Sequence, residues 1–316
     1  MIDDILKGTG CFVYSDPGGA KPILALAKKH KVNGHKSLVF TDRRYPFENI
    51  FGKIDYSKSL NINDVGLVDF IFTGTSYLSS LEKEWLLFAK QNKIRSYSFV
   101  DHYTGFKDRF LHNGKWITPD IIFVISTEVV NYASKKYGIS IEKFEVIGNP
   151  YFDYVKDWQP ELSYGQTFSN LEIDFGKKNI LYAPDPLSNV DGVTKFGFDE
   201  ITATIQIFNC IEDILCNVNL LFKPHPNQKI EKMLEVLPEN TLIVEESRMD
   251  NLHLMYYSDL IIGYFSNFLK EALLLNKNVL RYIPTESIYD PFSSEEWQCV
   301  NQNNLLKTIK QKINIE

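Results

Sequence analysis

The residues best suited to chemistry lie in a short loop, Phe222-Lys223-Pro224-His225-Pro226-Asn227, which follows the apolar run 219–221. The two prolines fix the backbone torsion φ on either side of the histidine and remove backbone donors, so the loop presents the imidazole stiffly. Such a histidine could bond a phosphate oxygen of a ligand or donate a proton to a departing phosphate. The alternative is an ordinary loop histidine between two helix-stopping prolines.

A second segment runs from an apolar strand through Gly263 into a helix that we expect to begin near Ser266 or Asn267. The loop exposes backbone N–H groups, and the positive end of the helix dipole favours a negative ligand. With Ser266 as the N-cap, the segment predicts a phosphate cradle, and Glu271 one turn further could reach a ribose hydroxyl. A plain capped helix with a solvated Glu271 is the alternative.

In the N-terminal half, adjacent Asp101 and His102 follow an apolar strand and precede Lys107, Asp108 and Arg109. Transfer of a group to a hydroxyl needs a carboxylate or an imidazole that accepts the proton, and cations that stabilise a leaving phosphate. Asp101 is the first candidate for the base and His102 the second. The alternative is a structural cluster in which Asp101 is a cap and Asp108 pairs with Arg109 in solvent.

Three further turns follow predicted strands and are candidate ligand-binding loops. Glycines in them permit a close approach of the backbone to a ligand, and hydroxyl groups could bind a sugar or cap a helix. The third turn could also be a hinge that ends the first domain. The turns contain Asp16, Gly18 and Gly19; Thr73, Gly74, Thr75 and Ser76; and Gly148 and Asn149.

Short apolar runs alternate with amphipathic stretches along the whole chain, which predicts parallel sheets with crossover helices. The predicted strands are 11–14, 37–40, 69–72, 95–100, 121–125, 144–147, 179–183, 219–223, 242–244, 260–263 and 279–282. The predicted helices are 22–30, 81–91, 128–137, 199–216, 229–237, 251–257, 266–275 and 303–313. The fold class is therefore α/β, with two Rossmann-like doubly wound domains that face each other across a cleft.

The length of 316 residues also favours two domains. We expect an N-terminal acceptor-side domain at 1–157, a surface linker rich in polar residues at 158–178, and a C-terminal nucleotide-donor domain at 179–316. The last predicted helix is expected to cross back and brace the first domain.

The composition excludes several classes of function. A net charge of -6 argues against a protein that binds mainly nucleic acid. No secretory signal or transmembrane segment is visible, so we expect a cytoplasmic chain, with peripheral contact to the inner membrane left open. The four cysteines have neither CxxC spacing nor clustered histidines, and no DxD pair accompanies Asp185 and Asp191, so no metal or other cofactor is expected.

The segment Lys223-Pro-His-Pro226, followed about forty residues later by Tyr264-Phe-Ser-Asn-Phe-Leu-Lys-Glu-Ala272, resembles the donor half of GT-B glycosyltransferases. It is most similar to bacterial polysialyltransferases and sialyltransferases with an HP motif, and to the glycerophosphotransferases of teichoic-acid synthesis. His225-Pro-Asn227 also resembles the non-hydrolysing UDP-N-acetylglucosamine 2-epimerases, which share the two-domain fold. The resemblance implies that His225 contacts the donor phosphate and Ser266 holds the nucleotide phosphate, although the usual second serine is Asn267 here.

The resemblance implies a metal-independent transferase that moves a sugar, with a sialic-acid-like sugar on a CMP-linked donor as the first choice. The acceptor would be a surface polysaccharide, a glycolipid or a glycoprotein. The alternatives are a glycerophosphotransferase that uses CDP-glycerol, a UDP-sugar epimerase or hydrolase, and a nucleotide-binding scaffold subunit without activity. The sequence leaves the oligomeric state and the stereochemical outcome open.

Overall fold

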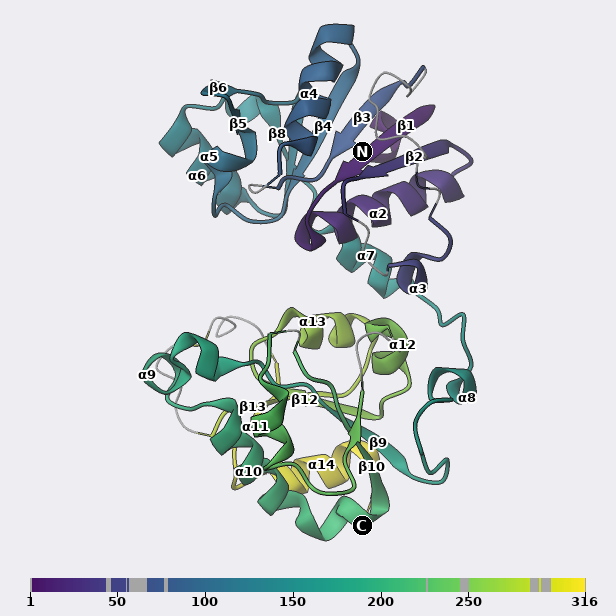
Figure 1. Cartoon of the computed structure of the whole chain (residues 1–316), viewed down its shortest axis with the longest axis vertical. Helices are drawn as coiled ribbons and strands as arrows, with labels where there is room; N and C mark the ends of the chain where they lie inside the picture. The colour runs from purple at the N-terminus through teal and green to yellow at the C-terminus, as the bar shows by residue number, and fades with distance from the viewer. Residues whose placement is uncertain are drawn as a thin grey trace. The chain divides into compact units, whose positions relative to one another are not determined.

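The computed structural model describes residues 2–43, 47–54, 56, 67–76, 79–225, 227–244, 250–284, 290 and 297–315. The chain divides into two units, residues 1–154 and 155–316 (Figure 1). Each unit has its own six-stranded parallel sheet and its own hydrophobic core.

The sheet of the first unit ends in the loops that carry more than half of the candidate residues. Its strands are β1 (Thr9–Tyr14), β2 (Lys36–Thr41), β3 (Phe70–Thr73), β4 (Arg95–Val100), β7 (Ile121–Val124) and β8 (Phe144–Val146). They are parallel in the order β2-β1-β3-β4-β7-β8. The strand order reverses between β1 and β3, and ligands of doubly wound sheets bind at the carboxyl ends of such strands.

Helices cover the sheet of the first unit on its two faces (Figure 1). Trp85 and Ala89 of one helix pack on Cys11, Val13 and Ile71 of the strands in a buried cluster. A small antiparallel hairpin of β5 (Leu111–His112) and β6 (Lys115–Trp116) leaves the sheet between β4 and β7. The helices are α1 (Ile2–Ile5), α2 (Pro17–Val32), α3 (Glu48–Phe51), α4 (Leu81–Asn92), α5 (Phe106–Phe110), α6 (Thr127–Tyr137) and α7 (Pro150–Lys156), with a 3₁₀ turn at Ile141–Lys143.

The sheet of the second unit has the strand order of dinucleotide-binding folds. Its strands are β9 (Lys178–Tyr182), β10 (Val218–Phe222), β11 (Leu242–Ile243), β12 (Leu260–Gly263), β13 (Val279–Tyr282) and β14 (Cys299–Val300). They are parallel in the order β11-β10-β9-β12-β13-β14. The order reverses between β9 and β12, which makes the loops after these two strands the expected ligand-binding edge.

The helices of the second unit enclose the larger core cluster, in which Tyr182, Phe222 and Tyr264 are fully buried. The helices are α8 (Tyr164–Thr167), α9 (Gly192–Phe196), α10 (Glu200–Ile211), α11 (Ile230–Leu234), α12 (Asn251–Tyr256), α13 (Asn267–Leu274) and α14 (Leu305–Ile313), with 3₁₀ turns at Leu187–Val190 and Glu212–Asn217. Each of the eleven predicted strands is present. The long helix predicted at 199–216 instead ends at Ile211 and continues as the 3₁₀ turn.

The segment 158–178, which the sequence predicts to be a surface linker, packs on the second unit. Trp158 is buried against the ring of His253, and Nε2 of His253 accepts hydrogen bonds from the N–H groups of Glu161 and Leu162. Asp250 fixes this imidazole through a 2.5 Å contact to Nδ1. The segment is thus held to the unit by a buried polar contact and by aromatic packing.

The last helix belongs to the core of the second unit, and the expectation that it also braces the first domain stays a prediction. Leu305, Ile309 and Ile313 of α14 are buried there, and α14 packs beside α10 (Figure 1). The three apolar residues recur at four-residue spacing on one helix face, which is the face that the core covers. Within the described ranges, no helix is long and apolar enough to cross a membrane.

The end of β12 approaches the end of β9 so closely that Gly263 has no room for a side chain. A Cβ on Gly263 would lie 2.7 Å from the carbonyl oxygen of Ala183. We therefore predict that Gly263→Ala lowers the stability of the chain by about 1–3 kcal/mol, which is a few degrees in the midpoint of thermal unfolding. Gly165→Ala is the matched control, because a Cβ there meets only a ring atom of Phe175 at 4.0 Å. Equal midpoints for the two variants would contradict the close approach.

Candidate functional site

At the switch point of the second sheet, a half-buried aspartate and a buried arginine hold the loop that joins β12 to α13. Oδ2 of Asp185, in the loop after β9, accepts a hydrogen bond from the N–H of Phe265 at 2.8 Å. Nε of Arg281, on β13, donates to the carbonyl oxygen of Tyr264 at 2.8 Å and is itself fully buried. The backbone that leads into Ser266 is therefore fixed from both sides.

Ser266 occupies the N-cap position of α13, as the sequence predicts, but its side chain does not cap the helix. Its Oγ is buried and makes no hydrogen bond within the described part of the chain. A buried hydroxyl at the positive end of a helix, with no protein partner, is suited to an anionic ligand. Asn267, the first residue of α13, is exposed, and Glu271 lies buried on the same helix rather than in solvent.

The loop after β10 fixes the imidazole of His225 in one tautomer. Nδ1 of His225 accepts a hydrogen bond from the N–H of Asn227 at 3.1 Å, so the proton of the neutral ring is on Nε2. The N–H of His225 donates to Oε1 of Gln228 at 3.1 Å, and the carbonyl of Asn227 accepts from Asn189 at 2.7 Å. These contacts orient Nε2–H as a donor.

The residues beside His225 differ in their surroundings. Lys223 is buried, and its ammonium lies 5.8 Å from the centre of the Phe268 ring on α13, which brings the two predicted motifs together. Pro224 is half-buried. Pro226 lies outside the described residues.

Asp185 is a site residue whose role the sequence left open. Burial raises its pKa to about 6, while the N–H groups of Phe265, Asp185 and Tyr264 and the charge of Arg281 oppose the rise. The signal in the sequence was its position directly after a strand, flanked by Pro184 and Pro186. Its contact to Phe265 joins residues 80 positions apart and follows only from the strand order.

In the first unit, the loops after β1, β3 and β4 converge at the carboxyl edge of the sheet. A Cβ on Gly19 would lie 3.6 Å from Cα of Gly74, and a Cβ on Gly18 would lie 3.4 Å from Oδ2 of Asp101. Asp16 caps α2 by accepting the N–H of Gly19 at 2.7 Å. The structure thus brings together the predicted residues of these three loops.

Arg109 is the buried connection between two of these loops. Its Nη1 donates to the carbonyl oxygen and to Oγ1 of Thr75 at 2.7 and 2.9 Å, and its Nε donates to Thr104. The same Nη1 is 2.9 Å from Oδ1 of Asp101. The alternative pairing of Arg109 with Asp108 in solvent is therefore wrong, because Arg109 is turned inward.

Asp101 and His102 present different atoms for proton transfer. Arg109 holds Oδ1 of Asp101, while Oδ2 faces Gly18. Nδ1 of His102 accepts from the N–H of Thr104 at 3.0 Å, so the neutral ring carries its proton on Nε2. In this arrangement His102 is a hydrogen-bond donor, and Asp101 is the better proton acceptor.

Three residues that were predicted to bind a ligand form hydrogen bonds within the protein through their hydroxyl groups. Oγ1 of Thr73 is 2.7 Å from the Ser98 hydroxyl, and Thr75 donates to the carbonyl of Phe99. Ser76 is buried and accepts from the N–H of Ser79.

The turn after β8 combines a left-handed glycine with a helix cap. Gly148 has a φ of 72°, and Asn149 accepts the N–H of Tyr151 at the start of α7. The geometry of Asn149 is therefore explained by its capping of α7.

Glu82, at the start of α4, is a buried carboxyl near the same edge, and the sequence analysis did not single it out. Neither of its oxygens makes a well-formed hydrogen bond to a described residue. Burial raises its pKa to about 7, and the negative charges of Asp16 and Asp42 add to the rise. Weak interactions with the N–H groups of Glu82 and Ser15 oppose it.

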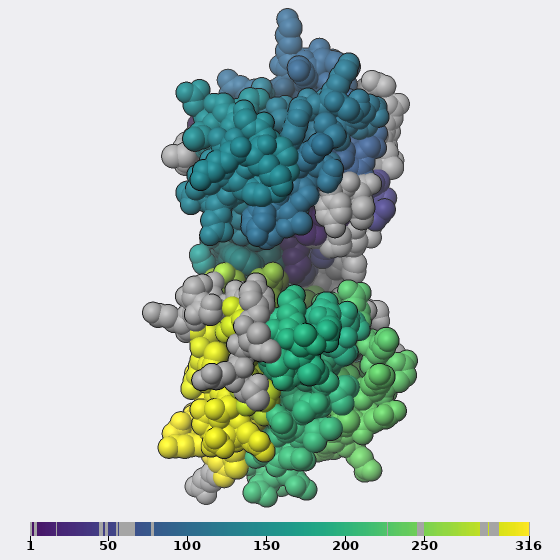
Figure 2. All heavy atoms as spheres, turned by 90° about the vertical axis from the view of Figure 1, so that its left-hand side faces the viewer, coloured from purple at the N-terminus to yellow at the C-terminus, as the bar shows by residue number. Residues whose placement is uncertain are grey.

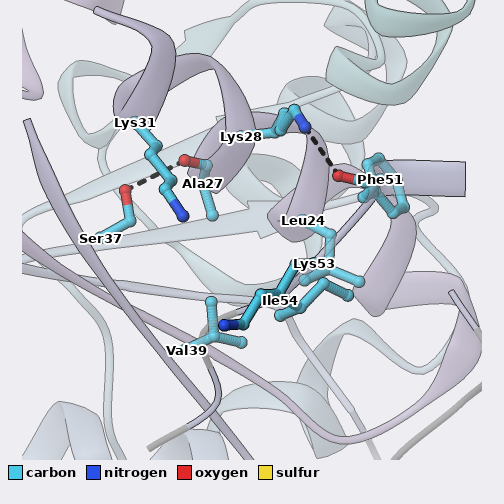
Figure 3. Close-up of a pocket in the computed structure, with 9 residues that line it drawn as sticks. All are labelled: Leu24, Ala27, Lys28, Lys31, Ser37, Val39, Phe51, Lys53 and Ile54. Atoms are coloured by element: carbon cyan, nitrogen blue, oxygen red, sulfur yellow. Dashed lines mark hydrogen bonds between the residues drawn. The ribbon is translucent and has the colours of Figure 1, made fainter. Parts of the chain in front are cut away.

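A small cavity in the first unit lies away from these loops, between α2, β2 and the residues that follow α3 (Figure 3). Its volume is about 30 Å³, which suits a single water rather than a nucleotide. Lys28 on its wall donates to the carbonyl of Phe51, and Ser37 donates to that of Ala27. The described residues also contain no group of three His, Cys, Asp or Glu side chains arranged to hold a metal ion.

Comparison with known families identifies one match that covers more than half of the chain. The model of the CDP-glycerol:poly(glycerophosphate) glycerophosphotransferase family matches residues 102–291. This range includes His102, His225 and Ser266. No curated protein matches the chain in sequence.

Solved structures share the fold over nearly the whole chain. The UDP-GlcNAc 2-epimerase of Neisseria meningitidis, bound to UDP-GlcNAc, is 15% identical with a TM-score of 0.64, over 97% of this chain and 91% of that chain. The UDP-GlcNAc 2-epimerase of Methanocaldococcus jannaschii is 13% identical with a TM-score of 0.62, over 98% and 93%. A glycosyltransferase of Rickettsia africae is 14% identical with a TM-score of 0.52, over 98% and 89%. The chain therefore has the GT-B fold.

We predict that Glu82→Gln stabilises the chain at alkaline pH and has little effect at pH 5. The pKa of Glu82 is raised from 4.5 to about 7 in the folded chain. The contribution of the protonated carboxyl to stability is therefore complete below pH 4.5 and is lost as the pH rises through about 7, because the folded chain must then bury a charge. Glutamine stays neutral, so the gain at pH 9 is up to roughly 3 kcal/mol. Thermal unfolding between pH 5 and pH 9 measures it.

Glu84→Gln on the same helix is the control, because Glu84 is exposed. A pH profile of Glu82→Gln that parallels that of the unsubstituted chain would show that Glu82 ionises normally.

Proposed function

Because the chain belongs to the CDP-glycerol:poly(glycerophosphate) glycerophosphotransferase family, we propose that it transfers glycerol phosphate, or a related polyol phosphate, from a CDP-linked donor to a hydroxyl. The acceptor oxygen forms a bond to the phosphorus that carries the polyol, and the bond from this phosphorus to the bridging oxygen breaks. The bridging oxygen leaves with CMP, and the acceptor proton passes to a base on the protein.

The orientation of the His225 ring carries the proposal. Its Nε2–H, set by the Asn227 contact to Nδ1, is the donor that would hydrogen-bond the leaving phosphate oxygen and stabilise the charge that develops there. Ser266 Oγ and the first N–H groups of α13 would bind the phosphates, since the hydroxyl has no described protein partner. The ammonium of Lys223 would add positive charge to this site.

Asp101 is our candidate for the base that accepts the proton of the acceptor hydroxyl. Arg109 fixes Oδ1, and Oδ2 remains on the side of the glycine loop after β1. His102, with its proton on Nε2, would instead donate a hydrogen bond to an oxygen of a ligand.

The donor choice follows the family match rather than the first sequence-based choice. A sialic-acid-like sugar on a CMP-linked donor stays a prediction, and CDP-glycerol is the donor that the family description favours. UDP-GlcNAc is bound by the Neisseria epimerase, and at 15% identity this likeness concerns the fold alone. We propose that neither a metal nor an organic cofactor takes part, and that the acceptor is a glycan or a lipid-linked chain.

The test is the release of CMP from CDP-glycerol in the presence of a glycerol-phosphate acceptor. We expect His225→Ala to lower kcat roughly 100-fold or more, the usual contribution of a donor aimed at developing charge, with a smaller effect on CDP binding. His225→Gln keeps a side-chain donor without a transferable proton, so it should retain binding better than alanine.

CMP-sialic acid and UDP-GlcNAc serve as competing substrates in the same assay. Turnover of either one in preference to CDP-glycerol, or full activity of His225→Ala, would refute the proposal. Ser266→Ala is the companion variant, for which we expect weaker binding of CDP.

We further predict that Asp185 acts by positioning the phosphate-binding loop. Asp185→Ala removes the acceptor of the Phe265 N–H, so the Kd for CDP in calorimetry should rise about tenfold. Asp185→Asn keeps an oxygen acceptor and should restore most of the affinity. If both variants bind CDP as the unsubstituted chain does, the loop does not depend on Asp185.

A further inference from the structure

A cavity of about 430 Å³ opens at the amino edge of the first sheet, opposite the loops described above. It lies between the end of α4, the starts of β4 and β7, and the hairpin that ends at Trp116. This volume is in the range of ligand-binding pockets. Figure 2 looks onto the face of this unit that carries α6 and the hairpin, in blue and teal.

The walls of this amino-edge pocket are positively charged, although the whole chain has a net charge of -6. Its cationic residues are Lys90, Lys93, Arg95 and Lys143. Asp120 is the acidic residue of the lining, and its Oδ2 already accepts the N–H of Ser96 at 2.8 Å and the Ser96 hydroxyl at 3.1 Å. A second acidic residue, Glu145, is not part of the lining, but it lies near Tyr97, as Arg95 and Asp120 do. The lining itself remains positive.

The cations of the pocket do not all belong to the exposed end of one helix. Lys90 is in the last turn of α4, where a cation stabilises the helix dipole. Lys93 follows that helix, Arg95 begins β4, and Lys143 precedes β8, so two separate segments, 90–95 and the turn before β8, place charge on one cavity. Lys143 is oriented by donating to Thr118 Oγ1 and the carbonyl of Pro119, both at 3.2 Å.

The exposed ring of Trp116 provides an apolar surface beside these charges, and its far side packs on Tyr137 at 5.4 Å between ring centres. Cations next to an aromatic ring, together with the hydroxyl of Thr118, suit a ligand that alternates phosphate with a short polyol. A nucleotide base is less suited, because the lining is polar over most of its residues.

We infer that the amino-edge pocket binds a phosphodiester segment of an anionic polyol-phosphate chain. This inference rests on the proposed function, in which successive transfers of glycerol phosphate would build such a chain on the acceptor. The six residues of β4 separate the pocket from Asp101 by about 20 Å, so a bound segment would be a part of the chain distant from the reacting end. Holding the chain there would keep its end near the transfer site between successive additions.

The test uses a fluorescein-labelled glycerol-phosphate oligomer titrated with the full chain and followed by fluorescence anisotropy. We expect Lys90→Glu/Lys93→Glu to raise the Kd at least about tenfold, because two exposed attractive charges become repulsive. Added salt should weaken binding by the unsubstituted chain. An uncharged glycerol oligomer should not bind.

Lys36→Glu/Lys307→Glu is the control, since these exposed lysines make the same charge change outside the pocket. Equal loss of affinity in both double variants, no oligomer binding by the unsubstituted chain, or equally tight binding of inorganic phosphate would each overturn the inference.

CMP release with a glycerol-phosphate monomer as acceptor separates this inference from the proposed function. The pocket variant should retain this turnover and make shorter chains. Absence of turnover in the unsubstituted chain would refute the proposed function, whereas the anisotropy titration still decides whether the pocket binds a phosphodiester chain.

Discussion

The geometry of the second unit depends on how the backbone between β12 and α13 is held. Asp185 binds an N–H and Arg281 binds a carbonyl of neighbouring residues in this loop, at 2.8 Å each. The close approach of Gly263 to Ala183 leaves the loop little freedom. A phosphate site built from backbone N–H groups needs such fixed dipoles, because donors that are already oriented lose little free energy when the ligand binds.

Ionisable groups with little exposure to solvent lie at the carboxyl edges of both sheets. Asp185 has a pKa of about 6 and Glu82 a pKa of about 7, both raised by burial. Arg109 and Arg281 are buried in turn and contact main-chain oxygens. Buried charge is costly unless it is paired, so its concentration at the carboxyl ends of the strands is typical of sites that organise loops for a ligand.

The strands and the fold class could be predicted because each strand is an apolar run between turn residues. The helix start at Ser266 and the convergence of Gly19 with Gly74 also follow from the rule that carboxyl ends of parallel strands meet. The pairing of Arg109 with Asp101 could not be predicted, since the burial of a side chain depends on the packed loops. The segment 158–178 was predicted to be a linker because it is rich in polar residues. The sequence does not indicate that Trp158 anchors it by packing on His253.

The most direct measurement is a crystal structure of the chain in complex with CDP-glycerol, or with CDP if the donor turns over. We predict a phosphate oxygen within hydrogen-bond distance of Nε2 of His225, with another phosphate oxygen at Oγ of Ser266 and the first N–H groups of α13. A nucleotide bound with its phosphates away from both His225 and Ser266 would contradict the account.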